Sequence, residues 1–293
     1  MRIGIVILPD ERWSVAGRRW QRAEEYGFDH AWTYDHIGWR DLVDGPWFDA
    51  VPTLTAAAMV TRRIQLGTYV ASPNFRHPVP FVRSALTLDD ISQGRLLLGV
   101  GAGGTGHDTS VLGGPVLPPR ERVDRFAEFL EITGQLLNTD HVSYQGQYYT
   151  AVDARNRPGP TRKPRTPLLV AAAGPRSLKL AARHGDGWIT YGDAAAEGTE
   201  EWWTALARQR DRFEAALAET GRDPATVSRY LTLDSAPGAP MSSADAFTDA
   251  TSRAAELGFT DVVGHWPRAS GWYAGSEKTL ETVAGLLPKL RKI

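Results

Sequence analysis

The group best suited to acid–base chemistry in this sequence is His36, which comes with Asp35 directly after a predicted strand. An imidazole changes its charge near neutral pH, so a histidine in a cavity can transfer a proton or stabilise a developing charge. A single histidine is also a common structural group in a protein core. The residue type alone therefore leaves both interpretations of His36 open.

Two segments rich in small residues could bring a ligand against the backbone. The stretch Val170-Ala171-Ala172-Ala173-Gly174-Pro175-Arg176-Ser177 predicts a strand running into a helix N-terminus, where free N–H groups favour a phosphate. The alternative is a tight turn between strand and helix whose small residues serve packing alone and bind no ligand. The stretch 98–106 follows another strand, and we expect the next helix only near Arg120. A backbone wall against a flat ring therefore fits this second stretch better than a dinucleotide loop.

Several kinds of chemistry are excluded by what the sequence lacks. No cysteine is present, so disulfides, thiolate nucleophiles and cysteine-based zinc sites cannot form. The histidines are dispersed without a His-x-His or HExxH pattern, and no Gly-x-Ser-x-Gly nucleophile motif occurs. We therefore expect neither a metal site nor a hydrolase built on a nucleophile elbow.

Charge and hydropathy exclude two classes of partner. The 33 Lys and Arg residues nearly balance 34 Asp and Glu residues, which removes the attraction on which non-specific nucleic-acid binding depends. No apolar stretch approaches the roughly 20 residues of a membrane span, and the opening run Ile3–Leu8 is too short for a signal peptide. We expect a soluble, cytoplasmic protein without nucleic-acid or membrane partners.

The elements that must position these residues alternate along the whole chain, which favours an α/β fold. Strands are predicted near Arg2–Leu8, Asp29–Tyr34, Ile64–Val70, Arg95–Val100, Pro167–Ala172, Gly187–Thr190, Arg229–Leu233 and Asp261–Gly264. Helices are predicted at Val15–Tyr26, Ala50–Thr61, Val79–Ser92, Arg120–Leu137, Pro175–His184, Thr199–Thr220, Ser243–Leu257 and Glu277–Leu290. This alternation predicts a single (β/α)8 TIM barrel over residues 1–293, with a doubly wound open sheet as the alternative. The segment 139–166 predicts an excursion that begins as a hairpin.

In such a barrel the site lies where the strands end, and those ends are rich in aromatic residues and histidine. Their wide apolar faces suit a pocket for a flat ligand, although packing in the core or at the rim explains each of them as well. The candidates for a substrate wall are Tyr34, Trp39, Trp47, His107, Tyr191, His265 and Trp266.

Four segments occur in the order and spacing of a known family: "AEEYGFDHAWTYDHIGW", "IQLGTYVASPNFRHPV", "LTLDDISQGRLLLGVGAGG" and "LLVAAAGPRSLKLAARHGDGWI". With the Leu88-Asp89-x-x-Ser92-x-Gly94-Arg95 signature and the Gly174-Pro175-Arg176 turn, they resemble the bacterial luciferase-like (β/α)8 oxidoreductases. The similarity runs from residue 1 to about residue 290 and implies a luciferase-like barrel.

The resemblance also implies a cofactor, which in this family is either flavin mononucleotide (FMN) or the deazaflavin coenzyme F420. The "AAAGPRS" turn and the Asp-His pair are similar to the F420 branch. The resemblance implies that Asp35 lies near the ring and that His36 is catalytic beside the reacting carbon. It places Tyr69 and Val70 at a bulge with a non-prolyl cis peptide. The remaining cofactor-binding residues that it implies are Gly101, Ala102 and Gly103 along the ring, and Ala172, Ala173, Gly174, Pro175, Arg176 and Ser177 along the tail.

One position departs from the family pattern. The sugar-phosphate and alcohol dehydrogenases of the F420 branch carry a glutamate acid directly after the glycine loop, where this sequence has Gly104. Lysines that would hold a substrate phosphate are also nearly absent from the rim. We therefore expect a different substrate, and another proton donor or none.

The residues and the resemblance together predict an F420-dependent oxidoreductase. It would transfer hydride between reduced deazaflavin and a small organic substrate, reducing a C=C or C=N bond. The alternatives are an FMN-dependent two-component monooxygenase and a non-catalytic barrel that binds a cofactor or ligand. A homodimer follows from the resemblance alone, and a partner enzyme that reduces the cofactor is part of the monooxygenase alternative.

Overall fold

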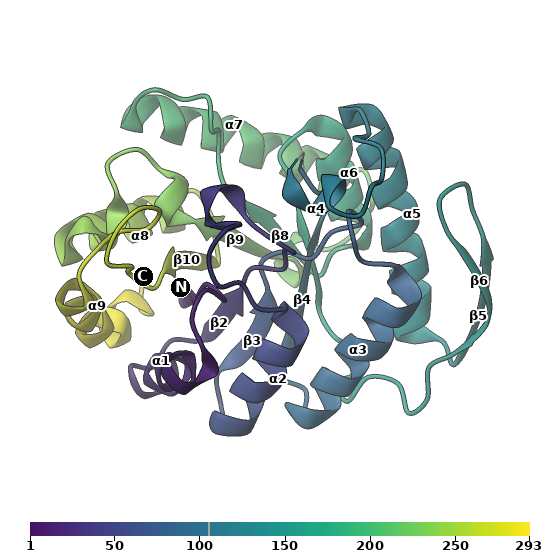
Figure 1. The fold of residues 1–293 in the computed structure, drawn as a ribbon. Helices are drawn as coiled ribbons and strands as arrows, with labels where there is room; N and C mark the ends of the chain where they lie inside the picture. The colour runs from purple at the N-terminus through teal and green to yellow at the C-terminus, as the bar shows by residue number, and fades with distance from the viewer. Residues whose placement is uncertain (105) are drawn as a thin grey trace.

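The computed structural model describes residues 1–104 and 106–293 of the chain, and it contains a closed barrel of eight parallel strands (Figure 1). Around the barrel the strands follow the order β1-β10-β9-β8-β7-β4-β3-β2. Their bounds are β1 Arg2–Val6, β2 His30–Thr33, β3 Gln65–Thr68, β4 Leu96–Gly101, β7 Leu168–Ala171, β8 Gly187–Thr190, β9 Ser228–Thr232 and β10 Asp261–His265. The barrel expected from the alternation of elements is confirmed, and the open sheet is excluded.

Helices separate the strands and form the outer layer of the barrel (Figure 1). They are α1 Trp13–Glu25, α2 Ala50–Val60, α3 Pro78–Ile91, α5 Pro119–Asn138, α6 Pro175–His184, α7 Thr199–Ala218, α8 Ala244–Glu256 and α9 Glu277–Leu290. Each expected strand and helix is present, with its ends displaced by two residues or fewer. One element differs from expectation, because a short helix, α4 (His107–Ser110), precedes α5 in the long loop after β4.

Four short 3-10 turns complete the elements, namely η1 (Arg40–Leu42), η2 (Pro224–Thr226), η3 (Leu233–Ser235) and η4 (Pro240–Ser242). The predicted excursion is an antiparallel hairpin of β5 (His141–Gln145) and β6 (Thr150–Arg155), which projects from the body beside α5 (Figure 1). The Glu128 carboxylate on α5 accepts backbone N–H groups of Gln147 and Tyr148 at 2.8 Å and ties the hairpin to the barrel. No helix in residues 1–104 and 106–293 is long and apolar enough to cross a membrane.

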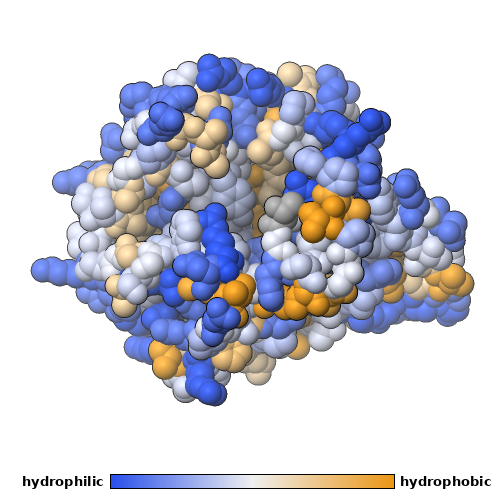
Figure 2. Space-filling view, turned by 45° about the horizontal axis from the view of Figure 1, so that its top comes forward, coloured by the Kyte–Doolittle hydropathy of each residue, from blue (hydrophilic) through white to orange (hydrophobic). Residues whose placement is uncertain are grey.

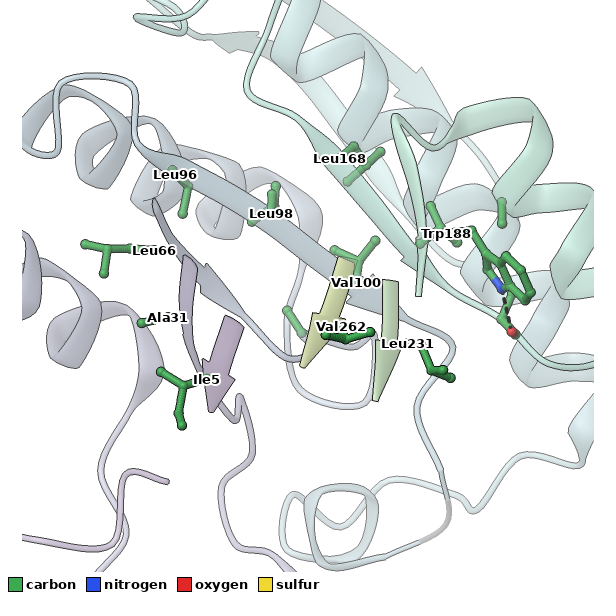
Figure 3. Packing of buried hydrophobic residues seen from close by; sticks show 14 of the residues in the cluster. Ile5, Ala31, Leu66, Leu96, Leu98, Val100, Leu168, Trp188, Leu231 and Val262 are labelled. Carbon is green, nitrogen blue, oxygen red and sulfur yellow. Dashed lines mark hydrogen bonds between the residues drawn. The ribbon is translucent and has the colours of Figure 1, made fainter. Parts of the chain in front are cut away.

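Side chains alternate along each strand between two buried clusters, as the pleat of a strand requires. Ile5, Ala31, Leu98 and Val262 belong to the larger cluster, which is buried between the strands and the helices (Figure 3). Their neighbours along the strands point into the barrel and form the smaller cluster, with Val6, Trp32, Leu97 and Val263 among its members. The barrel interior is therefore filled by side chains.

The amino end of the barrel is closed by a buried polar cluster. The His30 ring accepts the Trp32 indole N–H at Nδ1 (2.7 Å) and donates from Nε2 to the Asp261 carboxylate (2.9 Å). Arg2 pairs with the same carboxylate at 2.9 Å and donates to the Tyr230 hydroxyl at 2.8 Å. His30 and Asp261 are both fully buried, so their polar atoms are satisfied by Trp32, by Arg2 and by each other rather than by water.

Candidate functional site

A cavity of about 1060 Å³ opens at the carboxyl ends of the barrel strands. This volume is at the upper end of those that hold cofactors and other small molecules. The face seen in Figure 2 is hollowed near its centre, with hydrophilic and hydrophobic residues around the hollow. The cavity brings together fourteen of the predicted site residues, which are Tyr34, His36, Trp39, Tyr69, Val70, Gly101, Ala102, Gly103, Ala172, Ala173, Gly174, Ser177, Tyr191 and His265.

One wall of the cavity is made of backbone from the ends of β3 and β4. The peptide between Tyr69 and Val70 is cis, as the resemblance implied. Gly103 has φ +76°, and a Cβ built there would lie 2.7 Å from the Asn74 side chain. A Cβ at Gly101 would lie 2.9 Å from Val70 Cγ2. Glycine at both positions therefore leaves a flat surface that larger residues would disturb.

Hydrogen bonds from helix α5 and from the loop after β3 hold this glycine loop in place. Arg122 donates to the Gly103 carbonyl at 3.0 Å, and Asn74 donates to the Gly104 carbonyl at 2.9 Å. Arg125 donates in turn to the Asn74 carbonyl oxygen at 2.6 Å. The loop is thus fixed from behind, and its open side faces the cavity.

Beside this wall, after the neighbouring strand β7, the cavity meets the N-terminus of α6. Pro175 occupies the first turn of this helix, and its N-cap residue, Gly174, makes no side-chain capping bond. The first N–H groups of the helix are therefore available to an anion. The preceding residues are held from outside, since Trp188 donates to the Ala172 carbonyl at 2.9 Å and Gln209 donates to the Ala173 carbonyl at 3.2 Å. The indole of Trp188 lies on the outer side of the barrel, between the strands and the helices (Figure 3).

A second, more open hollow of about 600 Å³ adjoins the cavity at this helix end. Both spaces share Val123, Gly174 and Ser177 in their linings. Pro175 and Arg176 line this hollow rather than the main cavity, and the Arg176 guanidinium forms an ion pair with Asp124. A long ligand could therefore run from the glycine wall, past the start of α6, to the outer surface.

His36 is held by a carboxylate from the opposite side of the cavity mouth. The His36 Nδ1 lies 2.5 Å from Asp108 Oδ2, and the other Asp108 oxygen accepts the Ile37 N–H at 2.7 Å. Asp108 lies on α4 and is buried, whereas the His36 side chain is 27% exposed and lines the cavity. With Nδ1 bound to a carboxylate, Nε2 is the ring nitrogen left for a ligand.

Asp35 does not line the cavity, and the structure gives it a supporting position instead. Its fully buried carboxylate accepts two hydrogen bonds from Arg76, at 3.0 Å from Nε and 2.5 Å from Nη2. Burial raises the pKa of the Asp35 carboxyl, and the hydrogen bonds and charge of Arg76 oppose that rise. The pair fastens the turn that carries His36 to the loop after β3.

Three residues expected in the substrate wall also lie outside the cavity lining. The Trp47 indole donates to the His36 carbonyl at 2.8 Å and stacks behind Trp39. The His107 ring fills the space beside Gly38, where a Cβ would approach it to 2.8 Å. Trp266 packs on Tyr26, with ring centroids 6.2 Å apart, and so faces α1 instead of the barrel mouth.

A hydrogen-bonded chain of four side chains lies along the wall formed by β2, β9 and β10. Asp234 Oδ2 is 2.8 Å from His265 Nδ1, and His265 Nε2 is 2.9 Å from the Tyr34 hydroxyl. The Tyr34 hydroxyl is 2.8 Å from the Tyr273 hydroxyl. Burial raises the pKa of Tyr34 well above its ordinary value, so its hydroxyl keeps its proton at neutral pH.

The outer rim carries a cation between two indoles. The Arg40 guanidinium lies over the rings of Trp39 and Trp272, at 4.7 and 4.0 Å from their centroids. The Trp272 indole donates to Asp41 at 2.7 Å and joins the loop after β10 to the loop after β2. In residues 1–104 and 106–293, no group of three or more His, Asp or Glu side chains could hold a metal ion.

A family model described as luciferase-like monooxygenase matches residues 1–281 of the chain. The chain belongs to this luciferase-like family. Its barrel resembles that of an F420-dependent secondary alcohol dehydrogenase, with a TM-score of 0.83, 21% identity and 99% of each chain covered. The structure of the monooxygenase RslO1 from Streptomyces bottropensis is also similar, with a TM-score of 0.78, 20% identity and 99% and 98% of the two chains covered. At these identities the likeness concerns the fold.

Curated relatives are more similar in sequence but longer. An F420-dependent glucose-6-phosphate dehydrogenase from Amycolatopsis mediterranei is 34% identical over 217 residues, which cover 73% of this chain and 63% of the relative. An F420-dependent hydroxymycolic acid dehydrogenase from Mycobacterium tuberculosis is 32% identical over 218 residues, covering 73% and 56%. The luciferase-like chain thus spans about three-fifths of the length of the curated relatives that it matches.

Sequence reasoning missed four residues of this luciferase-like site, which are Arg40, Asp108, Asp234 and Tyr273. Asp108 was visible only as part of the loop after β4, and no local pattern links it to His36. Asp234 follows β9 directly, so the rule that sites form at strand ends was the signal that could have found it. Arg40 and Tyr273 lie in loops without any distinguishing motif.

Proposed function

We propose that this luciferase-like protein is an F420-dependent oxidoreductase that transfers hydride between reduced deazaflavin and a small organic substrate. Reduction of a polarised C=C or C=N bond is the reaction that we favour. The curated relatives named F420-dependent support the choice of cofactor. The observation that carries the proposal is a single cavity that joins a flat glycine wall, an imidazole and the N-terminus of α6.

The residues present fit such a cofactor. Gly101 and Gly103 line the cavity without side chains of their own, so a flat ring could lie against their backbone. The segment from Ala172 to Ser177 would receive a phosphate at the α6 N–H groups, and the adjoining hollow would receive the rest of a charged tail. When bound, a deazaflavin supplies hydride from carbon, since it has carbon at the position of the reactive flavin nitrogen.

His36 is the proposed catalytic residue. Asp108 fixes the Nδ1 proton, so that Nε2 is presented to the cavity in one tautomer. This nitrogen would polarise the substrate or exchange a proton with it as charge develops. Tyr69, Tyr191 and Trp39 surround the same space and exclude water from it.

The proposal is tested by titrating the purified protein with F420 and with FMN, following quenching of the cofactor fluorescence. Tighter binding of F420, together with anaerobic oxidation of reduced F420 by an unsaturated acceptor, supports it. Preference for FMN and consumption of oxygen with reduced flavin would instead establish a two-component monooxygenase. Cofactor binding with no turnover of any acceptor would leave only a binding barrel.

We also propose that one barrel domain over residues 1–293 acts as a homodimer in the cytoplasm, with another enzyme supplying reduced cofactor. The resemblance to luciferase-like enzymes supports the dimer. Light scattering at several protein concentrations measures the mass in solution, and a mass of one chain throughout would contradict it.

A further inference from the structure

The proposed reaction needs a proton as well as a hydride, and Gly104, directly after the glycine wall, has no side chain that could supply one. We propose that Tyr273 donates this proton to the substrate, and that Asp234, His265 and Tyr34 resupply it through their hydrogen bonds. This inference rests on the proposed function. It makes Tyr273 a catalytic residue, while the other three act through it.

The distances define a continuous path for a proton. The Asp234 carboxylate accepts both the His265 backbone N–H, at 2.5 Å, and its Nδ1–H, at 2.8 Å. This fixes the tautomer and directs His265 Nε2 to the Tyr34 hydroxyl at 2.9 Å, from which the Tyr273 hydroxyl is 2.8 Å away. Each hydroxyl can donate one hydrogen bond and accept another, so protons can move along the chain in either direction.

The direction in which these hydrogen bonds point depends on the charge of the His265 imidazole. When His265 is neutral, Tyr34 donates to Nε2 and Tyr273 donates to Tyr34. When His265 carries a second proton, Nε2–H donates to Tyr34, Tyr34 donates to Tyr273, and the Tyr273 proton is turned toward the cavity. An imidazolium held by Asp234 therefore prepares Tyr273 as a proton donor.

Burial and packing hold these four hydrogen-bonded side chains in one arrangement. The His265 and Asp234 side chains are only 1% and 10% exposed, so water cannot readily compete for their hydrogen bonds. The rings of His265 and Tyr273 stack with centroids 3.5 Å apart and an interplanar angle of 3°. Burial and the negative charge of Asp234 raise the pKa of Tyr273, while the hydrogen bond with Tyr34 and the positive charge of Arg40 oppose this rise. Tyr191 and Tyr69 face the chain from neighbouring strands, and both stay neutral near pH 7 because burial raises the pKa of each.

The step balances without a further reactant. The hydride brings an electron pair to one atom of the substrate double bond, and the π electrons form a new bond from the other atom to the Tyr273 proton. The Tyr273 O–H bond breaks, Tyr273 takes the Tyr34 proton, and Tyr34 takes the proton from His265 Nε2. His265 becomes neutral and, once the product has left, regains a proton from water in the cavity through the Tyr273 and Tyr34 hydroxyls, which line that cavity. The substrates expected are therefore polarised double bonds whose second atom reaches the Tyr273 hydroxyl.

The first test concerns the protein without cofactor. In ¹⁵N NMR spectra, Tyr34→Phe removes the hydrogen-bond partner of His265 Nε2 and should shift that nitrogen by several parts per million. Tyr148→Phe, on the distant hairpin, should leave it unchanged. An Nε2 resonance in the Tyr34→Phe protein identical to that of the wild type would overturn the inference, whatever the activity.

The second test measures oxidation of reduced F420 in a single turnover. Loss of a positioned proton donor is expected to slow it about 10²-fold in Tyr273→Phe, with F420 binding within twofold of the wild type. The solvent deuterium isotope effect on this single-turnover rate should differ between Tyr34→Phe and the wild type. If the wild type turns over and Tyr273→Phe is equally fast, the relay is wrong and the proposed function stands. If no unsaturated acceptor supports oxidation of reduced F420 by the wild type, the proposed function fails and the inference fails with it.

Discussion

His36 and Asp108 are separated by 72 residues in the chain, yet His36 Nδ1 and Asp108 Oδ2 lie 2.5 Å apart at the cavity mouth. The contact exists because the glycine loop after β4 carries α4 back over the turn that follows β2. A carboxylate in this position selects the imidazole tautomer and fixes the orientation of the ring. The pair is therefore the unit on which the proposed chemistry depends.

Replacing the carboxylate tests this unit. In Asp108→Asn an amide replaces the carboxylate that fixes the His36 tautomer, so single-turnover oxidation of reduced F420 should slow by about 10²-fold. Cofactor affinity, measured by fluorescence quenching, should change little because Asp108 lies behind His36. The matched control is Asp211→Asn, which breaks an exposed ion pair with Arg210 outside the cavity and should leave the turnover rate near that of the wild type. Equal rates in Asp108→Asn and the wild type would remove Asp108 from the mechanism.

The glycine wall gives a second test that needs no turnover. Gly103→Ala places a Cβ 2.7 Å from Asn74 on a backbone with φ +76°, which costs about 1–2 kcal/mol for a non-glycine residue. Because the loop must shift to relieve this, F420 affinity should fall about tenfold. Gly104→Ala is the matched control, since a Cβ there has no atom within 4 Å. The two variants should therefore differ in a fluorescence titration, and equal affinities would mean that the ring does not lie on this wall.

The barrel could be predicted from the sequence because its signals are local. Each strand is a short apolar run, and each helix repeats its apolar residues with a helical period. Gly27 and Gly258 end α1 and α8 with φ +89° and +80°, as expected of glycines placed after the last helical turn. The small residues at Gly101–Gly103 and Ala172–Gly174 reach the cavity for the same reason, since they directly follow predicted strands.

The remaining site residues depend on contacts between distant segments. His265 and Trp266 are neighbours in the chain, yet one faces the cavity and the other packs on Tyr26, because successive residues of a strand point to opposite sides. Applying that alternation to the end of β10 would have separated them. No such rule finds Asp108 or Tyr273, because each reaches its partner only after a loop has folded over the barrel.

The closed end of the barrel gives a prediction about pH and stability. Burial alone would raise the pKa of Asp261, but the hydrogen bond from His30, with the charge of Arg2, holds it below its ordinary value. Since the folded pKa lies below the unfolded value of about 3.9, this stabilisation is fully present above that pH. It is lost as the pH falls through the folded pKa.

Urea unfolding of Asp261→Asn at a series of pH values measures this contribution. Asp261→Asn removes a buried carboxylate that accepts hydrogen bonds from His30 and from the partly exposed Arg2, so it should lower the free energy of unfolding by about 1–3 kcal/mol near pH 7. The difference in free energy of unfolding between Asp261→Asn and the wild type should then become smaller as the pH falls below about 4. Asp153→Asn, on the exposed hairpin, should have a far smaller effect at every pH. A gap for Asp261→Asn that is constant from neutral to acid pH would contradict the assignment.

The last prediction concerns the position where an acid is absent. Gly104 lines the cavity, its φ is not in the left-handed region, and a Cβ there meets nothing within 4 Å. Gly104→Glu should therefore fold with a free energy of unfolding within about 0.5 kcal/mol of the wild type.

The carboxylate of Gly104→Glu would project into the cavity and could take the proton of an alcohol as hydride leaves the carbon. We expect reduction of oxidised F420 by a secondary alcohol to become at least about tenfold faster than in the wild type, since general-base catalysis contributes about 10²–10⁴-fold when well positioned. Gly104→Gln has nearly the same shape and no basic oxygen, so it should bring no gain. If the two variants oxidise the alcohol equally slowly, a carboxylate at this position does not reach the substrate, and the proton must be handled by the opposite wall of the cavity.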